Sequence, residues 1–216
     1  DNPVGHTVEV TTRTFWIKGP SNGVTIRGFT MKHAANPSQS CALCTSGYSS
    51  WTIENNVLSD TAGTIVALQG ANLNLVNNDI SRGGQLGVSV GGSTSLGWRT
   101  VTIRGNRIHD NNTEQFNQNW EAGGMKLLGA IDTVVDGNEV DNNNGPGIWC
   151  DGYCNGVTTS NNAVHHNERG IVYEISTNGK ITGNRVWENG WFPTQYGIWQ
   201  AGILLAEVAD VEVANN

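Results

Sequence analysis

The residues best suited to chemistry in this chain are two carboxylates, each at the end of a glycine-aliphatic stretch. Asp151 ends GPGIWCD and Glu174 ends ERGIVYE. A buried strand rarely contains an unpaired aspartate, so Asp151 close to the indole of Trp149 indicates a functional surface. Two neighbouring carboxylates are what general acid–base or nucleophilic attack on a glycosidic bond requires. The two carboxylates can act on the same bond only if the fold brings them close together.

An internal repeat predicts the elements that carry these residues. Its shortest spacing is 22 residues, and each unit contains a short alternating strand, an asparagine corner, a second short strand, a variable loop and a glycine-aliphatic strand. Three short strands without a helical period predict one turn of a parallel β-helix, in which stacked coils share one core. The units are GVTIRGFTM from Gly23, SWTIENNVL from Ser50, NLNLVNNDI from Asn72, TVTIRGNRI from Thr100, TVVDGNEV from Thr133, GVTTSNNAV from Gly156, NGKITGNRV from Asn178 and DVEVANN from Asp210.

The corner asparagines have a structural interpretation. Asparagine tolerates the backbone of a sharp corner and bonds nearby backbone groups through its amide, so stacked corners predict an amide ladder. The corners are Asn56, Asn78, Asn106, Asn138, Asn162, Asn184 and Asn216, with Phe29 in that place in the first unit. Alternation within the first strands predicts a core of Val24, Ile26, Ile53, Leu73, Leu75, Val101, Ile103, Val134, Val157 and Ile181.

The stretches NWEAGGMKL, GPGIWCDGYC, GIVYEIS and AGILLAE resemble right-handed parallel β-helix repeat proteins of the pectate-lyase-like superfamily, in particular a largely uncharacterised group of secreted bacterial proteins. The resemblance implies an all-β, single-stranded right-handed parallel β-helix over residues 1–216, with about seven coils of three strands and an N-terminal lead-in over residues 1–22. It also implies that the glycine-aliphatic strands line a substrate cleft. Those strands are residues 87–90, 124–128, 147–151, 170–174 and 202–206.

Alternation along these strands places one set of side chains on the outside of the coil. The first outward line is Ser89, Lys126, Trp149, Val172 and Leu204; the second is Gly91, Leu128, Asp151, Glu174 and Ala206. Adjacent strands are about 5 Å apart, so Asp151 and Glu174 are expected to be neighbours. We predict that Asp151, Glu174 and Lys126 are catalytic. The alternatives are ordinary solvated charges, or a carboxylate pair that binds Ca²⁺.

Two long loops, residues 113–122 and 189–200, are predicted to flank this strand face. Aromatic side chains in such loops suit the faces of sugar rings, although these loops could instead pack their aromatics down on the coils. The predicted substrate-binding residues are Trp149, Trp120, Trp199, Trp191, Tyr196, Glu121, His166 and Glu207.

Composition excludes several classes of function. The formal net charge of −7 argues against nucleic-acid binding, which needs a basic face. No apolar run approaches the ~18 residues of a membrane span.

The four cysteines form two close pairs, Cys41 with Cys44 and Cys150 with Cys154. We interpret each pair as a local disulfide or as packed thiols rather than as a metal site. Oxidation of the pairs would indicate an extracellular setting. His109 and His165 match no compact metal motif, so we assign no metal ligands and no certain cofactor.

The sequence therefore favours a secreted, carbohydrate-active protein that cleaves a polysaccharide. A hydrolase is favoured over a lyase, because a lyase needs cationic help for a uronate and only Lys126, with Arg169 nearby, offers it. The alternative is a non-catalytic structural, adhesin or glycan-binding β-helix. Because the last unit stops in mid-coil at Asn216, we also expect a fragment or an absent C-terminal cap, and self-association through that open coil as a further interpretation.

Overall fold

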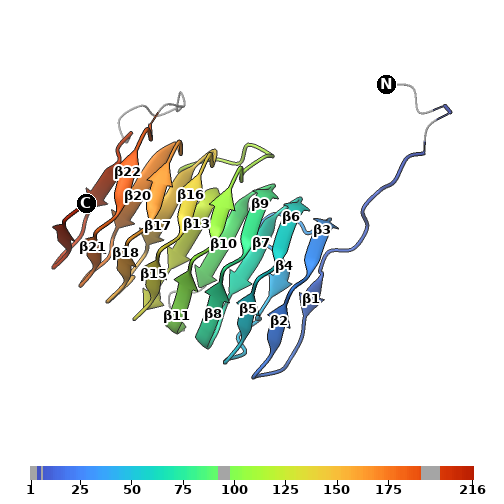
Figure 1. Ribbon diagram of the computed structural model, residues 1–216, viewed down its shortest axis with the longest axis horizontal. Helices are drawn as coiled ribbons and strands as arrows, with labels where there is room; N and C mark the ends of the chain where they lie inside the picture. Colours follow the sequence, from blue (N-terminus) through green and yellow to red (C-terminus); the bar gives the residue numbers. More distant parts are fainter. Residues whose placement is uncertain (1–3, 6, 92–97, 191–199) are drawn as a thin grey trace.

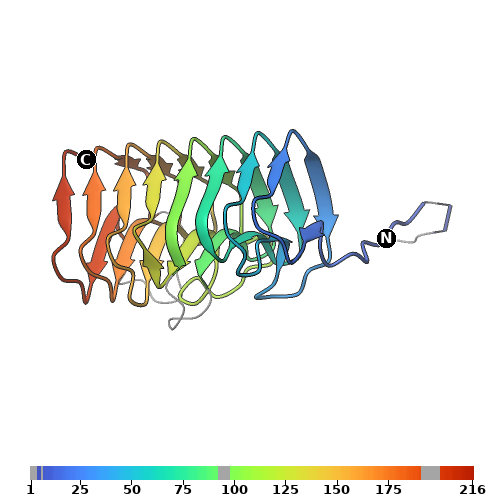
Figure 2. The ribbon, with the colours of Figure 1, turned by 90° about the horizontal axis from the view of Figure 1, so that it is seen from below.

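The computed structural model describes residues 4–5, 7–91, 98–190 and 200–216, and every regular element in these ranges is a β-strand. The strands stack into three parallel sheets that wrap around one axis (Figures 1 and 2). An irregular N-terminal segment extends away from the stack, and β1 begins at Ile17 within the predicted lead-in. The prediction of a parallel β-helix with three strands per coil is confirmed.

Sheet 1 carries the glycine-aliphatic strands. Its order is β1 (Ile17–Lys18), β4 (Cys41–Cys44), β7 (Thr64–Leu68), β10 (Leu86–Gly91), β13 (Gly123–Leu128), β17 (Pro146–Asp151), β20 (Arg169–Glu174) and β23 (Ile203–Ala206). Each strand pairs with the equivalent strand of the next coil, which sets the register of every outward side chain.

Sheets 2 and 3 lie on either side of the asparagine corners. Sheet 2 contains β2 (Thr25–Arg27), β5 (Thr52–Glu54), β8 (Ala71–Val76), β11 (Trp98–Arg104), β15 (Val134–Asp136), β18 (Thr158–Ser160), β21 (Lys180–Thr182) and β24 (Glu212–Ala214), with β14 (Ala130–Ile131) beside β11. Sheet 3 contains β3 (Thr30–Ala34), β6 (Val57–Thr61), β9 (Asp79–Gly83), β12 (Arg107–His109), β16 (Glu139–Asp141), β19 (Ala163–His165) and β22 (Arg185–Trp187).

The core is a narrow column of aliphatic side chains inside the coils. The predicted inward residues are buried, with Val24 partly so, except at one position. Val135 pairs with Ile103 and is fully buried, whereas Val134 is only partly buried. The prediction of Val134 was therefore wrong by one residue, because Val134 and Val135 are both aliphatic and alternation alone does not show which of them points inward. One residue of phase moves a side chain from the core to the outer face.

The predicted amide ladder is present at the corner between sheets 2 and 3. Each asparagine donates its Nδ2 to the Oδ1 of the next corner at 2.8–3.0 Å, from Asn56 through to Asn216. The same Oδ1 also accepts the backbone N–H of the preceding corner residue, as Asn138 Oδ1 does from Asn106. These bonds satisfy amides that are otherwise buried, so the corners hold the coils in register.

A second ladder, which the sequence interpretation missed, lies at the corner between sheets 3 and 1. Asn111, Asn143, Asn167 and Asn189 bond one another at 2.9–3.1 Å. Each of them follows a corner asparagine of the first ladder by five residues, and that constant offset was a usable signal. The second ladder fixes the approach to every sheet 1 strand from β13 onward.

The two cysteine pairs differ. Cys41 and Cys44 form a disulfide, whereas Cys150 and Cys154 are buried free thiols. Cys150 points into the core, as the alternation predicts, and its burial raises the pKa of the thiol. Both interpretations of the close pairs, disulfide and packed thiol, therefore occur in the same chain.

Candidate functional site

The outward face of sheet 1 carries the predicted lines of side chains in the predicted register. Ser89 pairs with Lys126, Lys126 with Trp149, Trp149 with Val172, and Val172 with Leu204. The second line is aligned in the same way, since Leu128 pairs with Asp151 and Glu174 pairs with Ala206. Sheet 1 therefore places Asp151 and Glu174 at the ends of neighbouring strands.

Lys126 lies at the centre of this face. Its Nζ is 2.8 Å from Asp151 Oδ2 and 3.8 Å from Glu121 Oε1, and it donates a hydrogen bond to the carbonyl oxygen of Trp120 at 2.5 Å. The two carboxylates therefore converge on one ammonium group from different elements, since Glu121 comes from the loop before β13 and Asp151 from the end of β17. The Lys126 side chain is only 5% exposed, so little water screens these charges.

Trp149 lies beneath this cluster and has its own polar contact. Its ring centroid is 3.8 Å from Lys126 Nζ and 5.7 Å from the guanidinium carbon of Arg169, both within cation–π distance. Its indole N–H donates to Glu174 Oε2 at 3.2 Å. Trp149 points out of the coil as predicted, yet it is only 3% exposed.

The loop of residues 113–122 causes that burial. Arg169 Nη2 donates to the carbonyl oxygen of Gln118 at 2.8 Å, and the bond from Lys126 to Trp120 ties down the end of the loop. The Trp120 side chain remains 53% exposed and is available to a ligand. The loop therefore covers Trp149 without packing its own tryptophan down.

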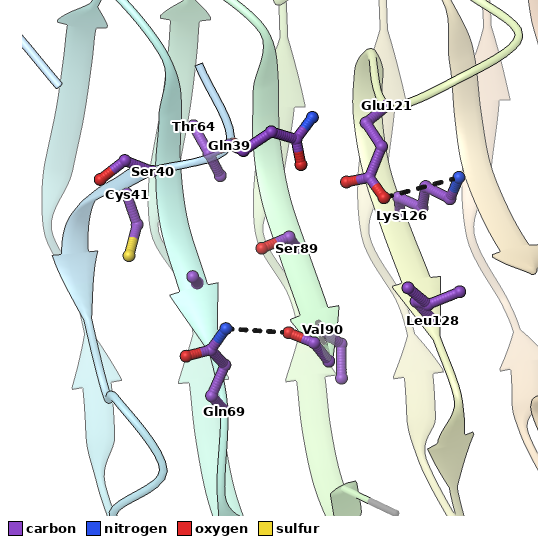
Figure 3. Close-up of a pocket in the computed structure, with 12 residues that line it drawn as sticks. Gln39, Ser40, Cys41, Thr64, Gln69, Ser89, Val90, Glu121, Lys126 and Leu128 are labelled. Carbon is purple, nitrogen blue, oxygen red and sulfur yellow. Dashed lines mark hydrogen bonds and ion pairs between the residues drawn. The ribbon is translucent and has the colours of Figure 1, made fainter. Parts of the chain in front are cut away.

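Glu121 lines a pocket of about 120 Å³ over the strands on the N-terminal side of Lys126 (Figure 3). Burial raises the pKa of the Glu121 carboxyl, Lys126 opposes that rise, and the charge of Asp151 adds to it. The lining also contains neutral polar side chains from the segment before β4, from β7 and the residue after it, and from β10: Gln39, Ser40, Thr64, Gln69 and Ser89. A partly buried acid thus faces a pocket with several hydroxyl and amide groups.

A second hollow, of about 190 Å³, lies on the C-terminal side of Lys126 and is lined by Asn119, Trp149, Arg169, Glu174 and Leu204. Arg169 is 5% exposed and its Nε donates to Glu168 Oε2 at 2.6 Å, and burial raises the pKa of Glu168. Glu168, Gln118 and Asn119 were absent from the predicted site, because their roles depend on how the loop folds back. The two hollows together follow the axis of the stack across sheet 1.

The remaining predicted residues are placed as follows. His166 was predicted to reach the cleft and does not: it follows β19 on sheet 3, and its Nε2 is 3.0 Å from Glu188 Oε2. The reason is that His165 is the last residue of β19, the strand that follows the asparagine corner. His166 therefore lies at the end of a sheet 3 strand, before the chain reaches sheet 1. Glu207 follows β23 and is exposed. Trp191, Tyr196 and Trp199 lie outside the described residues.

The sequence matches the family model described as "Right handed beta helix region" over residues 15–115 and 40–216. No curated protein matches it at a significant level. Among solved structures, XylC in complex with xylose aligns with a TM-score of 0.57 at 19% identity, over 77% of this chain and 34% of XylC. The described part of the chain contains no helix long and apolar enough to span a membrane.

Two further solved structures share the fold. The A-module of the mannuronan C-5 epimerase AlgE6 of Azotobacter vinelandii aligns with a TM-score of 0.53 at 14% identity, over 88% of this chain and 58% of the module. The Dettilon tailspike protein aligns with a TM-score of 0.53 at 15% identity, over 77% and 42%. The chain thus spans between about a third and three fifths of these proteins, and identities this low establish a common fold.

Proposed function

The chain belongs to the right-handed β-helix family, and from that premise we propose that it binds a polysaccharide along sheet 1 and hydrolyses it there. The observation that carries this proposal is the convergence of Glu121 and Asp151 on Lys126 Nζ, at 3.8 and 2.8 Å. The two carboxylate oxygens therefore lie no farther apart than the sum of these distances, close enough for both groups to reach one glycosidic bond. XylC, with its bound xylose, and the epimerase module support a carbohydrate ligand for this fold.

The three carboxylates differ in environment, and this difference suggests their roles. Because burial raises the pKa of Glu121, this residue retains its proton more readily and is suited to protonate the leaving oxygen. Asp151, ion-paired with Lys126, and Glu174, bonded by the Trp149 indole, supply negative charge. That charge would stabilise the oxocarbenium-like transition state of glycoside cleavage.

The charge balance of the face favours a neutral glycan over a uronate polymer. Lys126 and Arg169 are each already paired with acidic side chains. Among the described residues that line the two hollows, Glu174 is a further negative charge, and there is no third cationic side chain. A uronate carboxylate would meet an excess of negative charge here. The exposed Trp120 ring offers a sugar-stacking surface, and we extend the same role to Trp191, Tyr196 and Trp199.

We also propose that the protein is secreted, since the Cys41–Cys44 disulfide is the kind of bond that persists outside the reducing cytosol.

A second candidate function is glycan binding without cleavage. This candidate is favoured by the contacts of Lys126, because its ammonium group is already paired with Asp151 and Glu121 and bonded to the Trp120 carbonyl oxygen. The tailspike protein with the same fold is consistent with either proposal.

The test is a panel of neutral and uronate-containing polysaccharides, assayed for new reducing ends and for the absorbance of unsaturated uronate. The variants are Asp151→Asn, Glu174→Gln and Glu121→Gln, with Glu212→Gln on exposed sheet 2 as the control. We expect reducing ends from a neutral polymer, with at least a hundredfold loss for each site variant and none for the control. Binding without cleavage would favour the second candidate, and unsaturated products would replace hydrolysis with elimination.

A further inference from the structure

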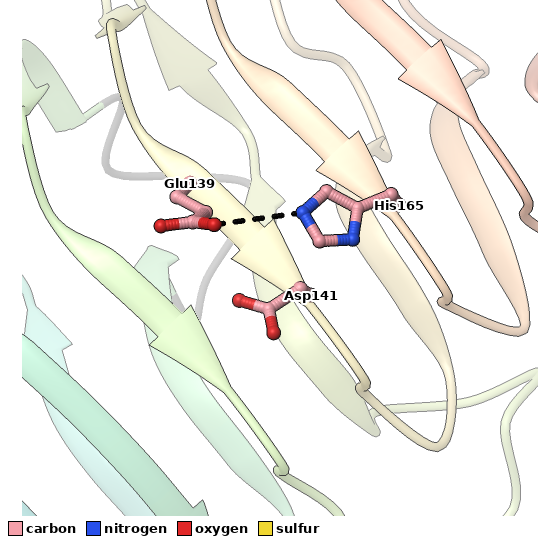
Figure 4. A group of neighbouring side chains, drawn as sticks. All are labelled: Glu139, Asp141 and His165. Carbon is pink, nitrogen blue, oxygen red and sulfur yellow. Dashed lines mark ion pairs between the residues drawn. The ribbon is translucent and has the colours of Figure 1, made fainter.

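A second cluster of polar side chains lies on the outward face of sheet 3 (Figure 4). It contains Glu139 and Asp141 from β16 and His165 from β19, and their ligand atoms all lie within 4.8 Å of one another. Asp141 and His165 are partners in the strand register. The Asp141 and His165 side chains are 2% and 13% exposed, while that of Glu139 is 50% exposed. Two of the three side chains are therefore held by their neighbours, and the third leaves the cluster accessible to solvent.

A chain of hydrogen bonds determines which nitrogen of His165 carries a proton. Glu188 Oε2 lies 3.0 Å from His166 Nε2, and a carboxylate only accepts, so His166 Nε2 carries the proton. In a neutral imidazole, His166 Nδ1 is then an acceptor. It lies 2.8 Å from His165 Nδ1, which must therefore donate. In neutral His165 the remaining nitrogen, Nε2, is left without a proton.

That bare nitrogen faces acidic groups. His165 Nε2 lies 3.6 Å from Glu139 Oε1, and no proton is available between them when the ring is neutral. Two lone pairs directed at each other repel, and a cation between them would relieve the repulsion. The ring is held in this direction by Trp187, which stacks on it with centroids 4.1 Å apart and an interplanar angle of 22°.

Arg107 balances part of the charge without closing the site. Its Nη2 and Nε donate to Asp141 Oδ2 and Oδ1 at 3.2 and 3.3 Å, and its Nε is 3.8 Å from Glu139 Oε2. Asn142 also donates to Asp141 Oδ2 at 2.7 Å. Two carboxylates and one guanidinium leave one net negative charge beside a neutral imidazole. Such outer contacts orient a ligating carboxylate while leaving further lone pairs on its oxygens.

We propose that Glu139, Asp141 and His165 form a binding site for Zn²⁺. An imidazole nitrogen with two carboxylates suits zinc, whereas Ca²⁺ and Mg²⁺ prefer oxygen ligands alone. Glu188 and His166 act as positioning residues, because they set the tautomer that exposes His165 Nε2. The ion would link β16 to β19 and so brace two successive coils on a face separate from sheet 1. The inference is therefore independent of the proposed hydrolysis.

The test measures Zn²⁺ binding to the whole chain after removal of metal with a chelator, by isothermal titration calorimetry and by metal content after dialysis. We expect one Zn²⁺ per chain and a higher thermal midpoint with the metal. Glu139→Gln and His165→Gln should each weaken binding at least tenfold. Glu188→Gln should weaken it by roughly tenfold, the effect typical of an outer contact to a metal ligand.

His109→Gln is the matched control. His109 occupies the same register position one coil before Asp141, but its nitrogens already contact Asp79 at 3.2 Å and Asp110 at 2.7 Å, so its loss should leave Zn²⁺ affinity unchanged. Bound Co²⁺ should show the visible absorption of a low-coordinate site in the parent and lose it in Glu139→Gln. Absence of binding would overturn the proposal, as would binding that survives Glu139→Gln, since that result would reduce the site to His165 and His166.

Discussion

The ammonium of Lys126 and the carboxylate of Asp151 lie on adjacent coils, with 2.8 Å between Nζ and Oδ2, and Lys126 is almost completely buried. The pair forms because β13 and β17 are in register, so that Lys126 is next to Trp149 and Asp151 is the next outward residue. Asp151 is therefore paired toward the N-terminal coil rather than left facing Glu174. This relationship organises the whole outward face of sheet 1.

Replacement of Lys126 by methionine should destabilise the protein by about 2–3 kcal/mol, because it leaves Asp151 and Glu121 without their shared cation in a poorly hydrated place. Urea unfolding measures this change. Lys180→Met on sheet 2, where the side chain is exposed, should have little effect. In a double-mutant cycle with Asp151→Asn, additive effects would show that the ion pair contributes nothing.

Trp149 offers a way to separate a hydrogen bond from a cation–π contact. Trp149→Phe keeps an aromatic ring between the cations but removes the donor to Glu174, at a cost of about 1 kcal/mol. Trp149→Leu also removes the contacts with Lys126 and Arg169 and should cost about 1–2 kcal/mol more. Equal unfolding free energies for the two variants would mean that the ring face carries no cation–π energy.

The raised pKa of Glu121 predicts a pH dependence of stability. A carboxyl with a folded pKa above its unfolded value binds more protons in the native state, so this group makes stability fall as pH rises from about 4.5 through the folded pKa. Glu121→Gln removes that decline, so the free energy needed to unfold the variant should increase relative to that of the parent as pH rises from about 4 to about 7. Urea unfolding across this range tests the sign, with Glu212→Gln as the comparison. A difference that is independent of pH would contradict the assignment.

The amide ladder predicts that a buried corner asparagine contributes more stability than an exposed one. Asn138 accepts from Asn106 and donates to Asn162 and to the Ile103 carbonyl oxygen, so Asn138→Ala leaves several buried groups unsatisfied and should cost about 2–4 kcal/mol. Asn22→Ala removes one exposed hydrogen bond, which Asn22 Oδ1 accepts from the Ser49 backbone N–H, and should cost about 1 kcal/mol or less. Denaturant unfolding of both variants checks the ranking, which equal costs would refute.

The fold was predictable because each coil repeats the same local solution. Asn78, Asn106 and Asn138 recur at equivalent corners, and alternation on both sides of them separates core residues from outward ones. The same regularity predicted the register that aligns Lys126, Trp149 and Val172. Val134 shows the limit of the method, since two adjacent valines leave the phase of the alternation undetermined.

The composition of the site was predictable only in part, and its contacts were not. Alternation directs Lys126 and Trp149 outward, but their burial results from the loop of residues 113–122, which returns to Arg169 through a backbone carbonyl that carries no sequence signal. Likewise, His166 is removed from the cleft by its place beyond β19 rather than by its residue type.

The sequence by itself determined the coils, the asparagine corners and the identity of the outward residues on sheet 1, since these depend on short-range periodicity. Only the tertiary structure decided that Asp151 pairs with Lys126, that Glu121 is partly buried with a raised pKa, and that Glu139 and Asp141 meet His165. These contacts join residues on different coils or on a loop that folds back. Their existence depends on side-chain reach and on exclusion of water between neighbouring turns, neither of which is encoded in spacing along the chain.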